Sequence, residues 1–451
     1  MKVEHRGHLL RADRKMNNNY PALSMIVAVF LLYLVPFTTL LLAVAATAIC
    51  LYRVIRYDAR VYAVDYCIMA PIMVLSRVGG GVPLMLYLSF FAAVRYFLFR
   101  GFRKEASYVI LLLLLNYLVL RMQMDINAFV LCFGQLFTLC ILIPEQDSES
   151  AEWAVKAFCL NLLISSIYTW LFRNNYVIRS ITGAEALALW GTNIKRFKGL
   201  FADPNFYMTL LTVAIALLLK LKDSNRIGTG YFAFMLLGMT VFGILTYSKT
   251  FFLMFVLLVG IYVVWQYWNK KVFRGLFFTV IAVVGMILIF TMKNSPFEVV
   301  LTRFRGAKNI SDFTTNRSDV YLLYLREITS DLSTAFFGKG LAADSMRFDP
   351  HNLYLEIAYY IGIIGLLFFG AFHVALVWLM RKRTRNDPRQ NLIAKYEVLL
   401  VVFALYFTLH GMFQPVMYVN FFLGYLSILL TKKQESGEKL ECEKIRLEMS
   451  P

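Results

Sequence analysis

The sequence predicts an all-α protein that crosses a membrane about 14 times, with two long external loops, the larger of them partly helical. Three observations predict this class. Apolar residues make up 59% of the 451-residue chain, while charged residues make up only 16%, against about 25% in a soluble domain. Mean hydropathy is +0.62. Apolar runs of about 17–25 residues, the length that a membrane helix needs, recur along the chain.

This composition excludes a disordered chain, a fibrous repeat and a soluble multidomain enzyme. The 6 cysteines include no C-x-x-C pair, which argues against a disulfide framework or a structural zinc site. The formal net charge of +18 would suggest nucleic acid in a soluble protein. Here the basic residues gather in segments that a membrane protein keeps in the cytoplasm, so we expect no nucleic-acid partner.

The first helices occupy residues 22–172, after a basic cytoplasmic arm at residues 1–21. The run at 22–53 is broken at Pro36 and indicates a hairpin of two short helices. The remaining helices of this group are expected at 61–76, 82–99, 107–121, 126–143 and 154–172. If 22–53 crosses once and 61–76 does not cross, the total falls to about 12.

The second group of helices lies within 204–292, and the third lies within 353–431. Between the groups, the external loops are 173–203 and 293–352, and residues 432–451 form a cytoplasmic tail. The individual helices are expected at 205–221, 229–247, 250–267, 273–292, 353–380, 395–412 and 415–431. Basic clusters such as 381–395 fall on the cytoplasmic side in this arrangement, which follows the positive-inside rule and places both termini in the cytoplasm.

Both external loops end in a similar sequence directly before an apolar run. Asp203-Pro204-Asn205 ends the first loop and Asp349-Pro350-His351 ends the second. Asp is a favoured N-cap and Pro is favoured at the first helical position. We therefore expect two capped helix N-termini on the external side. Such ends stabilise a helix in any protein, and they also favour phosphate groups.

Arginines of the two loops are candidates for phosphate binding, because a guanidinium group binds two oxygens at once and keeps its charge. Arg196 precedes Asp203, and Arg317 begins a short amphipathic helix expected at about 317–330. Further basic residues in external segments are weighed both as substrate contacts and as solvated loop charges: Lys249, Arg303 and Arg305.

His351 is one of 5 histidines, and we expect it in the first turn of a helix. The positive end of the helix dipole disfavours imidazolium, and a neutral imidazole can act as a general base. Motifs for metal ligands, a P-loop or a serine-hydrolase elbow are absent. We therefore expect neither a metal nor another cofactor.

The order of these motifs resembles the O-antigen ligase and polymerase superfamily. The resemblance covers about residues 190–370 and rests on short motifs between apolar runs, in chain order: R-x-x-G-x-F-x-D-P-N from Arg196 to Asn205, Ser248-Lys249-Thr250, Thr315-Asn316-Arg317, Phe337-Gly338-Lys339-Gly340, His351-Asn352-Leu353-Tyr354-Leu355-Glu356 and Gly362-Ile363-Ile364-Gly365. Two positions depart from the family pattern. Lys249 stands where many members have Arg, and Asn316 stands where many have Gly.

The resemblance implies a glycosyltransferase at the outer face of a bacterial plasma membrane. It implies that Arg196, Arg317 and His351 are catalytic, and the substrate-binding candidates around them are Asn205, Lys249, Arg303, Arg305, Asn352 and Glu356. The expected activity is that of a polysaccharide polymerase, which moves a glycan from undecaprenyl diphosphate to a sugar hydroxyl of a lipid-linked repeat unit. A flippase and a chain-length regulator are its expected partners.

Three alternatives stay open at this point. An O-antigen ligase or a protein O-oligosaccharyltransferase of the same family would carry the same motifs. A lipid-linked oligosaccharide flippase or another transporter would need charged residues inside its helices, and those identified here are few: Arg95, Lys156 and Glu356. No internal repeat of the kind common in transporters is visible. A structural scaffold would not explain the Arg and His residues of the loops.

Overall fold

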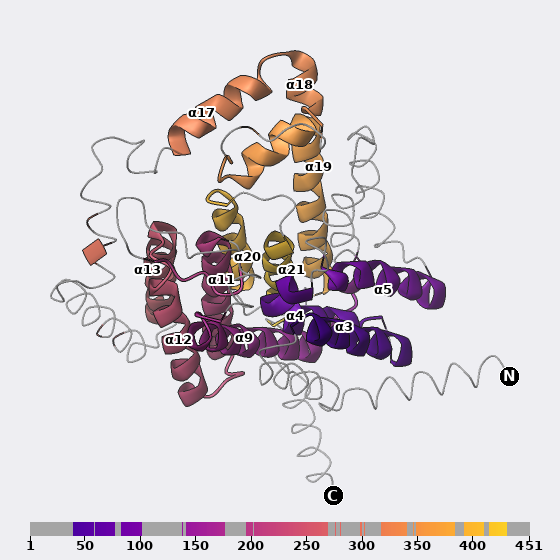
Figure 1. Ribbon diagram of the computed structural model, residues 1–451, viewed down its shortest axis with the longest axis vertical. Helices are drawn as coiled ribbons and strands as arrows, with labels where there is room; N and C mark the ends of the chain where they lie inside the picture. The colour runs from indigo at the N-terminus through magenta and orange to yellow at the C-terminus, as the bar shows by residue number, and fades with distance from the viewer. Residues whose placement is uncertain are drawn as a thin grey trace, which may run out of the picture.

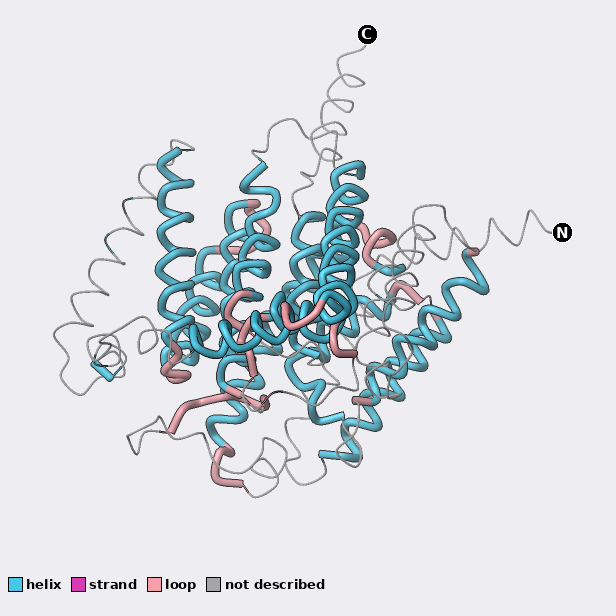
Figure 2. Tube along the Cα trace, turned by 90° about the horizontal axis from the view of Figure 1, so that it is seen from above, coloured by secondary structure: helices cyan, strands magenta, loops and turns pink. Residues whose placement is uncertain are grey.

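The computed structural model describes residues 39–57, 59–76, 83–101, 138, 141–175, 195–201, 203–268, 276, 280, 298–299, 302, 317–340, 346, 349–383, 392–409 and 415–430. Within these residues the regular structure is helical and contains no strand, which confirms the predicted all-α class. In the bundle, several helices of the second half of the chain run side by side, and some of the earlier helices lie across them (Figure 1, Figure 2).

The first described helices fall in the region predicted to hold the first membrane helices. They are α3 (Thr39–Arg56), α4 (Val61–Met69), the 3-10 helix η1 (Ala70–Ser76), α5 (Leu84–Arg100) and α9 (Ser148–Leu171). α9 begins earlier than predicted because Asp147 caps it, with its Oδ1 accepting from the Ser150 backbone N–H at 2.7 Å. The predicted helices at 107–121, 126–143 and 273–292 lie almost entirely outside the described residues.

α11 (Pro204–Asp223) is the central helix of the bundle. Nearly all of its side chains are buried, which suits a helix that is apolar on all faces. Its neighbours come from both halves of the chain: α9, α12 (Thr229–Ile244), α13 (Lys249–Trp268), α20 (Leu392–Tyr406) and α21 (Pro415–Leu429).

Further helices follow α13 in the described chain. α17 (Arg317–Ile328) and α18 (Leu332–Phe337) lie within the predicted larger loop and match its expected helical part. Both pack on α19 (Leu353–Arg383) at the top of Figure 1.

Polar contacts join the ends of the helices that the sequence assigns to the cytoplasmic side. Lys222 Nζ donates to Thr229 Oγ1 at 2.7 Å. We call this end of the bundle the opposite pole, because it lies across the bundle from the turn between α12 and α13. The other contacts here are Gln266 with Asp223 at 3.2 Å, Lys220 with Glu397 at 3.7 Å, and Arg226 with Glu152. The bundle thus brings together helix ends that the predicted alternation places on one side.

By length and composition, three of the described helices could cross a membrane: Ser148–Leu171, Pro204–Asp223 and Leu353–Lys382. Shorter apolar helices accompany them at Val61–Met73, Thr229–Ile244, Lys249–Val264, Tyr396–Tyr406 and Met417–Leu429. These helices support a membrane protein. They are fewer than the number of crossings predicted from the sequence, partly because several predicted helices lie outside the described residues.

A buried ion pair joins α3 to α4. Arg53 Nε lies 2.9 Å from Asp65 Oδ2, and both side chains are almost completely buried. The sequence analysis did not identify Asp65, because its apolar neighbours hide it inside a predicted helix. The two charged groups must pair closely here, because burying an unpaired charge carries a large free-energy penalty.

α19 is interrupted at Gly362, whose φ of 69° lies in the left-handed region. The break pairs with the segment that follows α18: the Lys339 N–H donates to the Tyr359 carbonyl at 2.8 Å, and the Gly340 N–H to the Tyr360 carbonyl at 2.9 Å. A Cβ atom on Gly362 would lie 2.2 Å from the Phe336 carbonyl oxygen. The two glycine motifs of the sequence therefore form one interlocked junction.

This junction yields a stability prediction. Gly362→Ala or Gly338→Ala should lower the free energy of unfolding by at least about 1–2 kcal/mol, because each residue has a positive φ that disfavours any side chain and a backbone neighbour closer than 2.5 Å to the new Cβ. Gly370→Ala is the matched control on α19, where a Cβ meets nothing within 4 Å. Thermal unfolding in detergent measures all three. Equal stability of the three variants would show that close packing of the two backbones at this junction does not stabilise the protein.

Candidate functional site

Arg196 ties the end of the first loop to the turn between α12 and α13. Its Nε donates to the Thr246 carbonyl at 2.8 Å, and its Nη2 donates to Asn205 Oδ1 at 3.3 Å. The next residue, Phe197, donates its backbone N–H to the Leu245 carbonyl at 2.9 Å. The arginine is thus held against the start of α11 and the turn after α12, and it is partly buried rather than extended into solvent.

The local sequence explains how the loop reaches this position. Phe197 packs in a ring cluster with Trp170, Tyr207 and Phe242. Gly199 has a φ of 55°, and a Cβ there would lie 2.8 Å from the Tyr207 ring. The glycine of the R-x-x-G motif therefore lets the loop turn tightly over an aromatic ring.

The predicted cap of α11 is confirmed. Asp203 Oδ1 accepts from the Asn205 backbone N–H at 2.5 Å, and Pro204 is the first helical residue. Asn205 Oδ1 also accepts from Ser248 Oγ at 3.4 Å, and Ser248 Oγ accepts from the Phe251 N–H at the start of α13. The N-termini of α11 and α13 therefore lie together beside Arg196, with Lys249 in the first turn of α13.

Arg317 brings the second loop to the same end of the bundle. Its Nη1 donates to the Thr408 carbonyl, just beyond α20, at 3.2 Å. Burial lowers the pKa of the Arg317 guanidinium, and the nearby Tyr321 and Asp203 partly offset this effect. The carboxylate of Asp203, at the end of the first loop, thus acts electrostatically on Arg317 in the second.

His351 lies at the start of α19, but not in its first turn. The prediction that Asp349 caps this helix is wrong. His351 has a φ of 46°, outside the right-handed helical region, so the helix begins only at Leu353. Asn352 is the cap, and its Oδ1 accepts from the Leu355 N–H at 3.1 Å. Glu356 follows in the first turn and is buried.

Tyr321 connects Arg317 to His351. It lies one turn after Arg317 on α17, and its hydroxyl is 3.3 Å from the His351 carbonyl oxygen. We call this end of the bundle the site pole; it comprises Arg196, Asp203, Asn205, Ser248, Arg317, Tyr321, His351, Asn352 and the Thr408 carbonyl. The structure therefore gathers the three residues predicted to be catalytic, together with Asn205 and Asn352. Arg303 and Arg305 lie outside the described residues.

The sequence analysis missed Lys198, Tyr321 and the role of Ser248. Lys198 is buried, and burial lowers the pKa of its ammonium group, while the Asp203 carboxylate opposes this change. A signal for Tyr321 was present, because side chains four residues apart lie on the same face of a helix. The spacing from Arg317 could therefore have identified it.

The chemistry of the site pole suits an anionic group. Two guanidinium groups and the N-termini of α11 and α13 favour negative charge. Among the described residues, no group of three or more His, Cys, Asp and Glu side chains could hold a metal ion. Comparison of the chain with protein-family models, curated proteins and solved structures finds no match, so the family resemblance rests on the sequence motifs alone.

The cap at Asp203 can be tested apart from its charge. Asp203→Ala should lower the free energy of unfolding by about 1 kcal/mol, whereas Asp203→Asn should cost far less, because Asn and Asp are equally good N-caps. Thermal unfolding of both variants in detergent provides the measurement. If Asn and Ala destabilise equally, the charge of Asp203 rather than its capping bond stabilises this end of α11.

Proposed function

We propose that the chain is a polysaccharide polymerase that extends O-antigen, capsule or exopolysaccharide chains on undecaprenyl diphosphate. One observation carries this proposal: two arginines and a histidine, from loops far apart in the sequence, meet at one pole of an apolar helical bundle. The negative charge of a diphosphate at the membrane surface is complementary to the positive charge of this pole. The motifs that resemble the polymerase and ligase superfamily include these three residues.

In the proposed reaction, the donor is a growing glycan on undecaprenyl diphosphate and the acceptor is a sugar hydroxyl of a lipid-linked repeat unit. The hydroxyl oxygen attacks the anomeric carbon, and His351 takes its proton. The bond from the anomeric carbon to the diphosphate oxygen breaks, and Arg196 and Arg317 stabilise the negative charge that the leaving group gains. A single displacement of this kind inverts the anomeric centre and requires no metal.

The proposal includes a location and a topology. The chain would cross the bacterial plasma membrane 12 to 14 times by the spacing of its apolar runs, with both termini in the cytoplasm and the site pole outside. Lipid-linked donor and acceptor would reach the site pole from the bilayer. A flippase that supplies the repeat units and a regulator of chain length would be functional partners.

A ligase that moves the glycan to lipid A core, or a protein O-oligosaccharyltransferase, would use the same site pole. Purified protein in lipid vesicles, supplied with lipid-linked repeat units alone, separates these activities. A polymerase makes longer lipid-linked chains, whereas a ligase or an oligosaccharyltransferase needs the added lipid A core or protein.

A flippase remains the alternative from another class. The buried Arg53–Asp65 pair favours it, because ionisable groups inside membrane helices often mark transport paths. The same vesicle assay distinguishes the two functions, since a flippase moves the repeat unit across the bilayer and forms no glycosidic bond.

The arginines are tested by charge removal. Arg196→Ala and Arg317→Ala should abolish polymer formation while the protein remains in the membrane. Arg196→Lys and Arg317→Lys should keep little activity, because lysine cannot bind two oxygens in the planar geometry of a guanidinium group. Arg326→Ala is the matched control, since Arg326 lies exposed on the same helix as Arg317. Long chains from both Ala variants would exclude a diphosphate role for these arginines.

His351 is tested as the general base. His351→Ala should lower turnover by about 10²–10⁴-fold with little change in donor binding, because the arginines hold the diphosphate. His351→Gln keeps a hydrogen-bond donor but cannot act as a base. Near-normal turnover of His351→Gln across pH would remove this role and leave the arginine roles intact.

A further inference from the structure

The Tyr321 hydroxyl lies between two helix ends of the site pole. Its oxygen is 3.3 Å from the His351 carbonyl oxygen and 3.2 Å from the Phe407 carbonyl oxygen. Asn352, the cap of α19, is a further hydrogen-bond partner of this side chain. One hydroxyl group thus contacts the backbone just before α19 and the backbone just after α20.

The backbone at His351 needs such support. A φ of 46° at a residue with a bulky side chain is uncommon, and such a conformation persists only where the surrounding structure fixes it. On its C-terminal side, the Asn352 cap fixes the start of α19. At the carbonyl of His351 itself, the contact comes from Tyr321.

α17 holds the Tyr321 side chain in place. Arg317, one turn earlier on the same face, donates to the Thr408 carbonyl. One turn later on this face, the buried Tyr324 ring packs edge-on against Tyr359, with the ring centroids 5.1 Å apart. Tyr321 therefore belongs to a row of anchored side chains and does not sit at a loose helix end.

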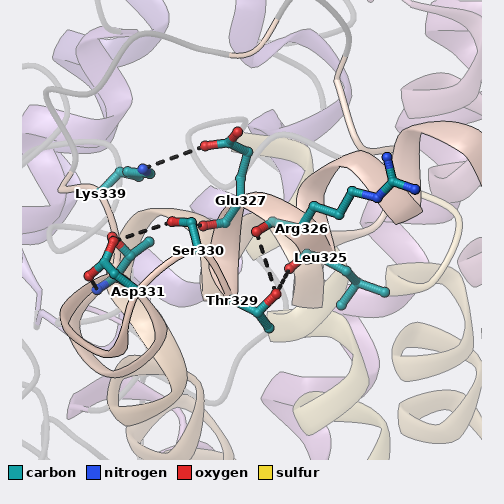
Figure 3. Close-up of polar contacts among 8 residues, drawn as sticks. Leu325, Arg326, Glu327, Thr329, Ser330, Asp331 and Lys339 are labelled. Atoms are coloured by element: carbon teal, nitrogen blue, oxygen red, sulfur yellow. Dashed lines mark hydrogen bonds and ion pairs between the residues drawn. The ribbon is translucent and has the colours of Figure 1, made fainter.

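The corner between α17 and α18 adds a second restraint (Figure 3). Asp331 caps α18, with Oδ1 accepting from the Thr334 N–H at 2.8 Å, and Thr329 Oγ1 donates back to the Leu325 carbonyl at 2.8 Å. Lys339 Nζ lies 3.5 Å from Glu327 Oε2, which ties the end of α17 to the junction with α19. α17 is thus fixed at both of its ends.

We propose that Tyr321 is a positioning residue of the site, which sets the backbone at His351 and thereby directs its imidazole. Burial raises the pKa of the Tyr321 hydroxyl, although Arg317 and Asn352 partly oppose this. The hydroxyl therefore stays protonated and able to donate near neutral pH. The catalytic consequence rests on the proposed transferase function, whereas the effect on His351 itself does not.

Tyr321→Phe removes the hydroxyl and keeps the ring. It should lower kcat by about 10–100-fold, the scale of a small misplacement of a reacting group, with little change in KM for the lipid-linked donor. In a His351→Gln background the same change should add almost no further loss, because residues that act through one another are not additive. Assays in lipid vesicles with lipid-linked repeat units give both values.

Tyr354→Phe is the matched control. The Tyr354 hydroxyl also joins α19 to α20, donating to the Phe403 carbonyl at 3.3 Å, without involving His351. Tyr354→Phe should leave kcat unchanged. An equal loss in both variants would mean that Tyr321 acts only as a structural tie, and this outcome would overturn the proposal.

A readout independent of transfer completes the test. Diethyl pyrocarbonate modifies neutral imidazole, and peptide mass spectrometry follows its rate at His351 in the full-length protein across pH. Tyr321→Phe should change this rate severalfold, while Tyr354→Phe should not. An unchanged rate in Tyr321→Phe would overturn the positioning role. If Tyr321→Phe changes this rate but the wild-type protein transfers no glycan, the positioning role stands and the proposed function is refuted.

Discussion

The absence of water inside a bilayer dominates this structure. An apolar chain in that environment must satisfy its backbone N–H and C=O groups within helices, and irregular backbone is tolerated only where other protein groups pair with it. The turn after α11 accordingly lies at the opposite pole, and the turn after α12 lies at the site pole. Gly362 follows the same constraint, because the break that it creates in α19 is paired with the backbone at Lys339 and Gly340.

The same constraint explains why the arginines of the site pole are well placed. The last carbonyls of a helix lack partners within the helix, and Arg196 and Arg317 donate to Thr246 and Thr408, which follow the ends of α12 and α20. These contacts use Nε of Arg196 and Nη1 of Arg317, and they help to fix the position of each guanidinium group. The negative C-terminal end of a helix thus stabilises each guanidinium cation. The cation is therefore held in place before any ligand binds.

Much of the bundle could be predicted from apolar runs alone, as α11 and α13 illustrate. Features that depend on contacts between distant residues could not. The apolar run starting at 353 gave the start of α19 correctly, but its cap was misplaced because Asp349-Pro350 carries a capping pattern. The left-handed backbone at His351 has no signal in the sequence. The partner of Gly362 was likewise hidden, since its motif and that of Gly338 look independent until the two backbones meet.

For the candidate site, residue types and the family resemblance suggested Arg196, Arg317 and His351, but not the residues that hold them in place. Tyr321 and Lys198 carry no motif of their own, and their positions follow from how the two loops pack. Asp65 escaped notice because a single carboxylate inside an apolar helix is visible only beside its partner, Arg53.

The break in α19 also bears on how the chain is made. Residues 363–383 rise about 30 Å, a full hydrocarbon thickness, so the insertion machinery can take up this part of α19 as a complete segment. Residues 353–361 need not enter the bilayer with it. Their partners at Lys339 and Gly340 leave the ribosome just beforehand, and contacts between nearby segments form quickly. The junction can therefore close soon after synthesis, before α20 and α21 exist to complete the bundle.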